Sequence, residues 1–184
     1  MTVLIYACLL FVGSHVLLSS TPLRERLARL FGESGFFGLY VIVALLTLGW
    51  MTVAFFDAPN VALWEDPLWG RGLLFLLMPL VCVLLVAGLT SKNPTMAAIG
   101  RLDPVENVPG IFRITRHPVM WALALWSGGH VLANGDKASL LFFGSFFTLS
   151  LAGPFLIERK KRAKGGPAWE TFVAKTSILP FAAI

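Results

Sequence analysis

The sequence has few charged side chains, and long parts of it have none. Charged residues make up 14% of the 184 residues, whereas a soluble domain carries about 25%. Hydrophobic residues make up 57%, and the mean hydropathy is +0.77. This composition excludes a disordered chain and argues against a soluble globular protein.

Cysteine is scarce as well, with only Cys8 and Cys82, and both lie in apolar stretches. A disulfide scaffold needs paired cysteines in an oxidising compartment, so we expect two membrane-buried thiols instead. The first ten residues carry no basic side chain, which a secretory signal peptide requires. We therefore expect the first apolar stretch to be retained as a membrane helix.

Five stretches lack Asp, Glu, Lys and Arg altogether. A membrane-spanning helix needs about 20 mostly apolar residues, because lipid offers its backbone no hydrogen-bond partners. Four stretches have 19 to 22 residues, and the one of 15 residues reaches 18 with its polar neighbours. The sequence thus predicts an all-α integral membrane bundle, one domain over residues 1–184, with five transmembrane helices and a cytoplasmic C-terminal tail. The stretches are Thr2–Ser20, Gly35–Phe56, Gly72–Thr90, Val119–Ala133 and Ala138–Ile157.

Basic residues are distributed unevenly between the predicted loops. The first loop, the third loop and the C-terminal tail lie on one predicted side of the membrane and carry 13 of the 15 basic residues. The second and fourth loops lie on the other side and carry only Arg71 and Lys137. Because cytoplasmic loops carry an excess of Lys and Arg, this predicts an N-terminus outside the cytoplasm and a tail inside it. The lipid bilayer then explains the pI near 9.6 without a nucleic-acid partner. The basic run Arg159–Lys164 is expected to anchor the tail at the headgroups.

Turn-forming residues mark the ends of the fourth and fifth predicted helices. Asn134-Gly135-Asp136 predicts a tight hairpin between them. Pro118 suits the first turn of the fourth helix, with His117 beside its cap. Pro79 and Pro154 fall inside predicted helices and are expected to kink them.

All three histidines lie on or beside two of the predicted helices. His15 lies well inside the first, His130 lies near the outer end of the fourth, and His117 lies at the inner end of the fourth. An ionisable side chain in hydrocarbon is costly and is by default a functional candidate. Neutral imidazole is a good ligand for haem and transition metals, but it also forms hydrogen bonds between helices. Both roles therefore stay open.

Helical geometry separates His117 from His130. They are 13 residues apart, which leaves about 140° between their faces and about 20 Å along the helix axis. One compact ligand therefore cannot bind both from the same face. Gly13 beside His15 and Gly128 beside His130 would allow a flat ligand between the first and fourth helices, or equally close helix packing.

Several short motifs taken together resemble the NnrU family. Phe11–Ser20 followed by Leu23-Arg24 resembles the opening of that family, and Thr115–Pro118 with Trp121 and His130 resembles a later part. The similarity extends over nearly the whole chain. NnrU proteins are bacterial membrane proteins associated with nitrite and nitric oxide reduction. They are similar to zeta-carotene isomerase, a haem b membrane enzyme of carotenoid synthesis.

This resemblance implies a haem b site with His15 and His130 as axial ligands, since the matching histidines are the proposed ligands in that relative. It also implies the bacterial inner membrane and either isomerisation of a cis-polyene or an accessory role in nitrogen-oxide respiration. Arg24 and Arg116 are candidates for pairing with the haem propionates. His117 lies closer to His15 in predicted depth and remains the alternative ligand. The oligomeric state stays open.

A more distant resemblance is to the isoprenylcysteine methyltransferase superfamily. Arg116-His117-Pro118, Glu158 and the aromatic tail resemble a pattern that encloses S-adenosylmethionine in that superfamily. Here Trp169 and Phe172 stand where tyrosines are expected, and the paired acids reduce to Glu158. The alternative function is therefore a methyltransferase-like membrane protein. Its tail either folds back over the inner end of the bundle or lies as an amphipathic helix at the surface.

Overall fold

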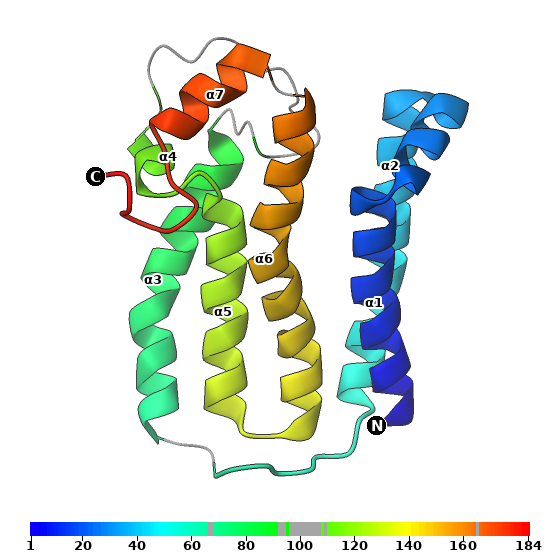
Figure 1. Ribbon diagram of the computed structural model, residues 1–184. Coiled ribbons are helices and arrows are strands. Elements are labelled where there is room, and N and C mark those ends of the chain that lie inside the picture. Colours follow the sequence, from blue (N-terminus) through cyan, green and yellow to red (C-terminus); the bar gives the residue numbers. More distant parts are fainter. Residues whose placement is uncertain (66–67, 92–94, 96–107, 109, 165) are drawn as a thin grey trace. The chain divides into compact units, whose positions relative to one another are not determined.

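The computed structural model of the protein describes residues 1–65, 68–91, 95, 108, 110–164 and 166–184. Within these residues the backbone forms helices and one isolated bridge, between Ala62 and Asp136, but no strand. The helices (Figure 1) are α1 (Thr2–Ser20), α2 (Pro22–Phe56), α3 (Leu68–Thr90), α4 (Gly110–Ile114), α5 (Pro118–Asn134), α6 (Lys137–Lys164) and α7 (Gly166–Ala174).

The chain divides into two compact units. Unit 1 comprises Met1–Leu73 and Ser127–Leu149, and therefore contains α1, α2, the end of α5 and the start of α6. Unit 2 comprises Leu74–Trp126 and Ser150–Ile184, and contains most of α3, all of α4 and α7, and the remaining parts of α5 and α6. A single domain over residues 1–184 stays a prediction.

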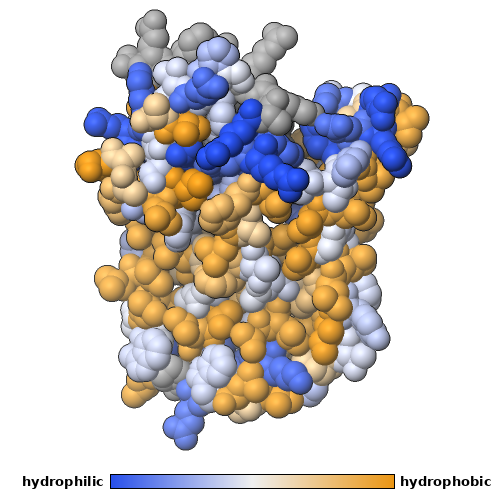
Figure 2. Space-filling view, in the orientation of Figure 1, coloured by the Kyte–Doolittle hydropathy of each residue, from blue (hydrophilic) through white to orange (hydrophobic). Residues whose placement is uncertain are grey.

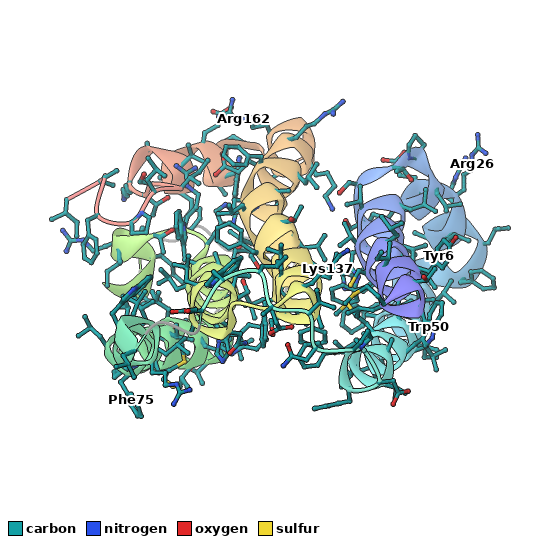
Figure 3. The ribbon with its side chains drawn as sticks, turned by 90° about the horizontal axis from the view of Figure 1, so that it is seen from below. Tyr6, Arg26, Trp50, Phe75, Lys137 and Arg162 are labelled. Carbon is teal, nitrogen blue, oxygen red and sulfur yellow. The ribbon has the colours of Figure 1, made fainter. Side chains whose placement is uncertain are left out.

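Among the described helices, α1, α2, α3 and most of α6 are long and apolar enough to cross a membrane. The fifth predicted span, α5, has 17 residues, a length of about 26 Å against a hydrocarbon core of about 30 Å. Large apolar side chains on these helices face outward: Leu46 is 69% exposed, and Phe75, which points away from α3 (Figure 3), is 84% exposed. Such faces suit lipid better than water. The predicted all-α membrane bundle is confirmed.

The region predicted as the first loop, Thr21–Ser34, is mostly helical, which corrects the sequence interpretation. Here α2 begins at Pro22, a favoured first-turn residue, and the Thr21 hydroxyl accepts a hydrogen bond from the Leu23 N–H (3.2 Å). Gly32 interrupts the helix with a φ of 74°. The sequence interpretation took the charged residues before Gly32 as a loop. They form a helix instead, because this Leu- and Arg-rich segment has good helix propensity, and the chain breaks only at Gly32.

The predicted hairpin between α5 and α6 is confirmed. Gly135 takes a φ of 68°, which glycine adopts without strain, and the carboxylate of Asp136 accepts a hydrogen bond from the Ser139 N–H (2.9 Å), capping α6. The Gly135 carbonyl accepts hydrogen bonds from the N–H groups of Leu63 (2.8 Å) and Trp64 (3.1 Å). The segment that follows α2 is thereby tied to this turn.

Helix α6 is longer than its apolar part. It continues past the predicted end at Ile157 to Lys164, so the basic run is helical, and Arg162 projects from this end (Figure 3). In Figure 2, hydrophobic side chains cover the middle of the helices, and hydrophilic side chains gather at the helix ends. This pattern is typical of helices whose charged ends reach the headgroup region.

Candidate functional site

His15 lies on α1 with its ring held in one orientation. Its Nδ1 lies 2.8 Å from the main-chain carbonyl oxygen of Phe11, one turn earlier. A carbonyl can only accept, so Nδ1 carries the proton and donates this hydrogen bond, which leaves the lone pair on Nε2. Histidines that bind metals commonly have their second nitrogen held in this way, because the bond fixes the tautomer and the ring orientation.

Two aromatic rings lie beside His15. The ring of Phe11 lies 4.4 Å away and that of Tyr40, on α2, lies 5.7 Å away, measured between centroids. Tyr40 lies 6.4 Å from Phe36, and the guanidinium of Arg24 lies 5.2 Å over the Phe36 ring. The structure thus connects Arg24 to His15 through two rings of α2. Tyr40 was missed as a site residue, because its place depends on how α2 packs beside α1 (Figure 1).

His130 lies on α5 against α6. Its ring stacks on Phe143, with 4.6 Å between centroids. Phe143 belongs to a group of contacting rings on α6 that extends to Phe146, and Phe146 lies 5.2 Å from Phe11. The rings of α6 therefore connect His130 to the surroundings of His15 within unit 1.

The two histidines lie at different levels along the helices. Helices α1 and α6 run in the same direction. Phe11 is level with Phe146, so His15, four residues further along α1, is level with residue 150 of α6. His130 is level with Phe143. The Cα atoms of the two histidines therefore differ in height along the helix axis by about seven residues, or about 10 Å. Helical side chains lean toward the N-terminus of their own helix. Since α1 and α5 run in opposite directions, the two imidazoles lean toward each other, which shortens this gap.

The glycines beside the two histidines differ in what surrounds them. A Cβ atom at Gly128 would lie 3.0 Å from the ring of Phe147, whereas one at Gly13 would meet no atom within 4 Å. Close helix packing therefore accounts for Gly128, and a flat ligand does not fit directly against it. Gly13 is exposed, so the face of α1 on which it lies is open.

Arg116 and His117 lie in unit 2, just before α5, and face Glu158 of α6. The Oε1 atom of Glu158 lies 3.3 Å from both Arg116 Nη1 and His117 Nε2, and the three side chains are at most 7% exposed. Burial lowers the pKa of His117 to about 3, and the charge of Arg116 acts in the same direction, so the imidazole is neutral. Burial also lowers the pKa of Arg116, which Glu158 opposes.

The C-terminal tail covers this cluster. Arg116 Nη2 donates a hydrogen bond to the carbonyl of Thr176 (2.8 Å), and the indole Nε1 of Trp121 donates one to the carbonyl of Ile178 (2.8 Å). Helix α7 packs its aromatic side chains against α4 (Figure 1). The tail therefore folds back over the start of α5, as one of the two sequence alternatives expected.

The five predicted site residues thus form two groups. Unit 1 holds His15, His130 and Arg24, whereas unit 2 holds Arg116 and His117 together with Glu158. Within the residues that the structure describes, no group of three or more His, Cys, Asp or Glu could hold a metal ion.

The family described as "NnrU protein" matches residues 3–184. The chain is 35% identical over 75 residues to a protein of Zea mays, and 33% identical over 75 residues to one of Arabidopsis thaliana, both named "15-cis-zeta-carotene isomerase, chloroplastic". Each match covers 41% of this chain but only 20% of the relative, and no solved structure matches. Because the family match extends over almost every residue, the chain belongs to the NnrU family.

Proposed function

We propose that the protein is a haem-binding membrane isomerase that converts a cis double bond of a lipophilic polyene to trans. The observation that carries the haem part of this proposal is His15, whose Nδ1–H bond to the Phe11 carbonyl leaves Nε2 to act as a ligand. The names of the two plant relatives support isomerisation of a 15-cis carotene. Because those relatives are matched over only a fifth of their length, the substrate is part of the proposal.

His15 would hold the haem through Nε2, and His130, whose imidazole leans toward it, would be the second histidine that holds the group. Arg24 would pair with a propionate in competition with Glu33, whose carboxylate lies 2.8 Å from its guanidinium. When bound, haem b would supply an iron centre that lowers the barrier to rotation about a double bond of the polyene.

The chain itself would bind and orient the polyene. The rings of Phe11 and Tyr40 beside His15, and of Phe143 beside His130, offer flat apolar surfaces that suit a conjugated chain. They would also shield a bound polyene from water. The exposed apolar faces of the helices would let such a substrate enter from the lipid.

The proposal includes the bacterial inner membrane, with the N-terminus in the periplasm and the tail in the cytoplasm. The distribution of basic residues supports this orientation. A fluorescent protein that folds only in the cytoplasm, fused after Ile184, should fluoresce in intact cells. Loss of that fluorescence, with the fusion protein still present in the membrane, would contradict the orientation.

The haem is tested by the optical spectrum of the purified full-length protein, together with a pyridine haemochrome assay. We expect a Soret band that is lost in His15→Ala and His130→Ala and retained in the matched variant His117→Ala. Retention of the band after both His15 and His130 are replaced would refute the ligand assignment. A colourless protein from haem-supplemented cells would refute haem binding.

The isomerase is tested separately, by chromatography of a 15-cis polyene after incubation with the reduced, haem-loaded protein. Conversion that depends on reduction supports the proposal. A haem-loaded protein that converts no polyene would favour the accessory role in nitrogen-oxide respiration. Methyl transfer stays a prediction, and saturable binding of S-adenosylmethionine to the purified protein is the measurement that checks it.

A further inference from the structure

A second candidate site, in unit 2, lies where α5 begins. Pro118 is its first residue, and its first main-chain hydrogen bond runs from the Trp121 N–H to the His117 carbonyl (3.1 Å). The N–H groups of Val119 and Met120 therefore have no acceptor within the helix. The N-terminal end of a helix also carries a partial positive charge, which favours an anion.

Arg116 and His117, the two residues directly before α5, carry unpaired polar atoms, which are an independent sign of a ligand. The side chain of His117 is fully buried and that of Arg116 is 7% exposed. Among the described residues, nevertheless, His117 Nδ1 and the Nε and Nη1 atoms of Arg116 have no hydrogen-bond partner. Buried polar atoms nearly always have one. The contact between Arg116 Nη1 and Glu158 is an ion pair that lacks hydrogen-bond geometry.

The chemistry of these atoms specifies the ligand. Because neutral His117 donates its Nε2–H toward Glu158 (3.3 Å), its Nδ1 is an acceptor. The free atoms of Arg116 and the first N–H groups of α5 are all donors. The complementary group has several anionic oxygens and one hydroxyl, which describes hydrogen phosphate and the singly protonated form of a phosphate monoester. Sulfate at neutral pH has the oxygens without the hydroxyl.

We propose that the N-terminus of α5, together with Arg116 and His117, binds the phosphate group of a phosphate monoester. The group can belong to a lipid such as phosphatidic acid or to a soluble phosphate, since the recognised chemistry is the same. The tail segment held by Thr176 and Ile178 lies over the cluster and must move aside for the ligand to enter. This site is independent of the proposed haem site and uses neither His15 nor His130.

The test uses the full-length protein in phosphatidylcholine nanodiscs, with tryptophan emission as the readout, because the Trp121 indole bonds to the covering tail. Inorganic phosphate should give a saturable change, and sulfate at the same ionic strength a weaker one. Nanodiscs containing phosphatidic acid should give the same change, and those with the phosphodiester phosphatidylglycerol should not. A response to inorganic phosphate, to phosphatidic acid or to both supports the site, and it shows whether the phosphate group comes from a soluble molecule, a lipid or either. Equal binding of sulfate, or a response to neither phosphate, would overturn it.

Two variants with opposite expected effects keep the test decisive. Arg116→Lys should weaken phosphate binding about tenfold, since lysine loses the planar set of donors. Glu158→Gln should tighten binding, because it removes a negative charge beside the anion and keeps an acceptor for His117. Arg29→Ala, an exposed arginine of α2 in unit 1, is the matched control and should change nothing. Weaker binding in Glu158→Gln would mean that the cluster is only structural and would overturn the proposal, even if Arg116→Lys fails to fold.

Discussion

The two units each contain an arginine paired with a glutamate, but in very different surroundings. In unit 1, Arg24 and Glu33 lie 2.8 Å apart with side chains that are 27% and 72% exposed. In unit 2, Arg116 and Glu158 lie 3.3 Å apart and are almost fully buried. Losing one partner should cost less in the exposed pair, because water screens its charges, whereas removing one partner of the buried pair leaves an unpaired buried charge. The burial of an ion pair, and not the distance between its charges, should therefore decide how much the stability of each unit depends on that pair.

Replacing Glu158 by alanine should have the largest effect on stability. It leaves the guanidinium of Arg116 buried without its carboxylate, a change that costs about 3–5 kcal/mol. The free energy of unfolding can be followed by circular dichroism in detergent. Glu170→Ala, an exposed position on α7, is the control and should stay within about 0.5 kcal/mol. Equal losses in the two variants would break the comparison between buried and exposed charges.

The pH dependence of unit 2 follows from His117. Its pKa is lowered by burial to about 3 in the folded protein, against about 6.5 in an unfolded chain. Between these values the unfolded chain binds a proton that the folded protein does not, so stability rises with pH in this window. Stability should thus be lost as pH falls from about 6.5 toward 3, by at most about 1.4 kcal/mol per pH unit from this group.

This dependence is measured as the difference between the wild type and His117→Asn over the same pH range. Other groups titrate in both proteins, so only the additional slope of the wild type reports on His117. Above pH 6.5 the difference should be constant. If the stability curves of the wild type and His117→Asn run parallel below pH 6.5, His117 has the same pKa in the folded and the unfolded chain. Burial in unit 2 would then have no effect on this imidazole.

A substitution in the turn between α5 and α6, in unit 1, should cause a loss of stability of intermediate size. Alanine at Gly135 would have to adopt a φ of 68°, and its Cβ would lie 2.5 Å from the Trp64 carbonyl oxygen. We expect a loss of about 1–3 kcal/mol, as for other strained backbone positions. Gly144→Ala, in the same unit with no atom within 4 Å of its Cβ, is the control. A stable Gly135→Ala would show that this turn does not hold unit 1 together.

Much of the fold could be predicted because charge is excluded from lipid. The predicted spans ending at Ser20, Phe56 and Thr90 end at the same residues in α1, α2 and α3, since polar and charged residues follow each of them. The start of α2 could not be predicted in this way. The segment before Gly32 is rich in arginine, which indicates a loop by charge, although its propensity is helical.

The candidate site was less predictable, because it depends on contacts between helices. His15, His130 and Arg116 were identified as residue types that are costly in a membrane. Nothing in the sequence shows that Tyr40 faces His15 or that Glu158 serves both Arg116 and His117. These pairings follow from the rotation of each helix about its axis, and a single sequence does not specify it.

Arg24 supplies the smallest expected change and the sharpest form of the comparison. Arg24→Ala removes the ion pair with Glu33 and the contact with the Phe36 ring, each of which contributes at most about 1 kcal/mol at an exposed site. The same substitution at Arg116 should cost several times more, because it strands a buried carboxylate. Adding salt should shrink the Arg24 effect further and leave the Arg116 effect nearly unchanged, since screening reaches only exposed charges. Equal salt dependence at both positions would mean that the tail does not keep water from Arg116, and the contrast between the units would disappear.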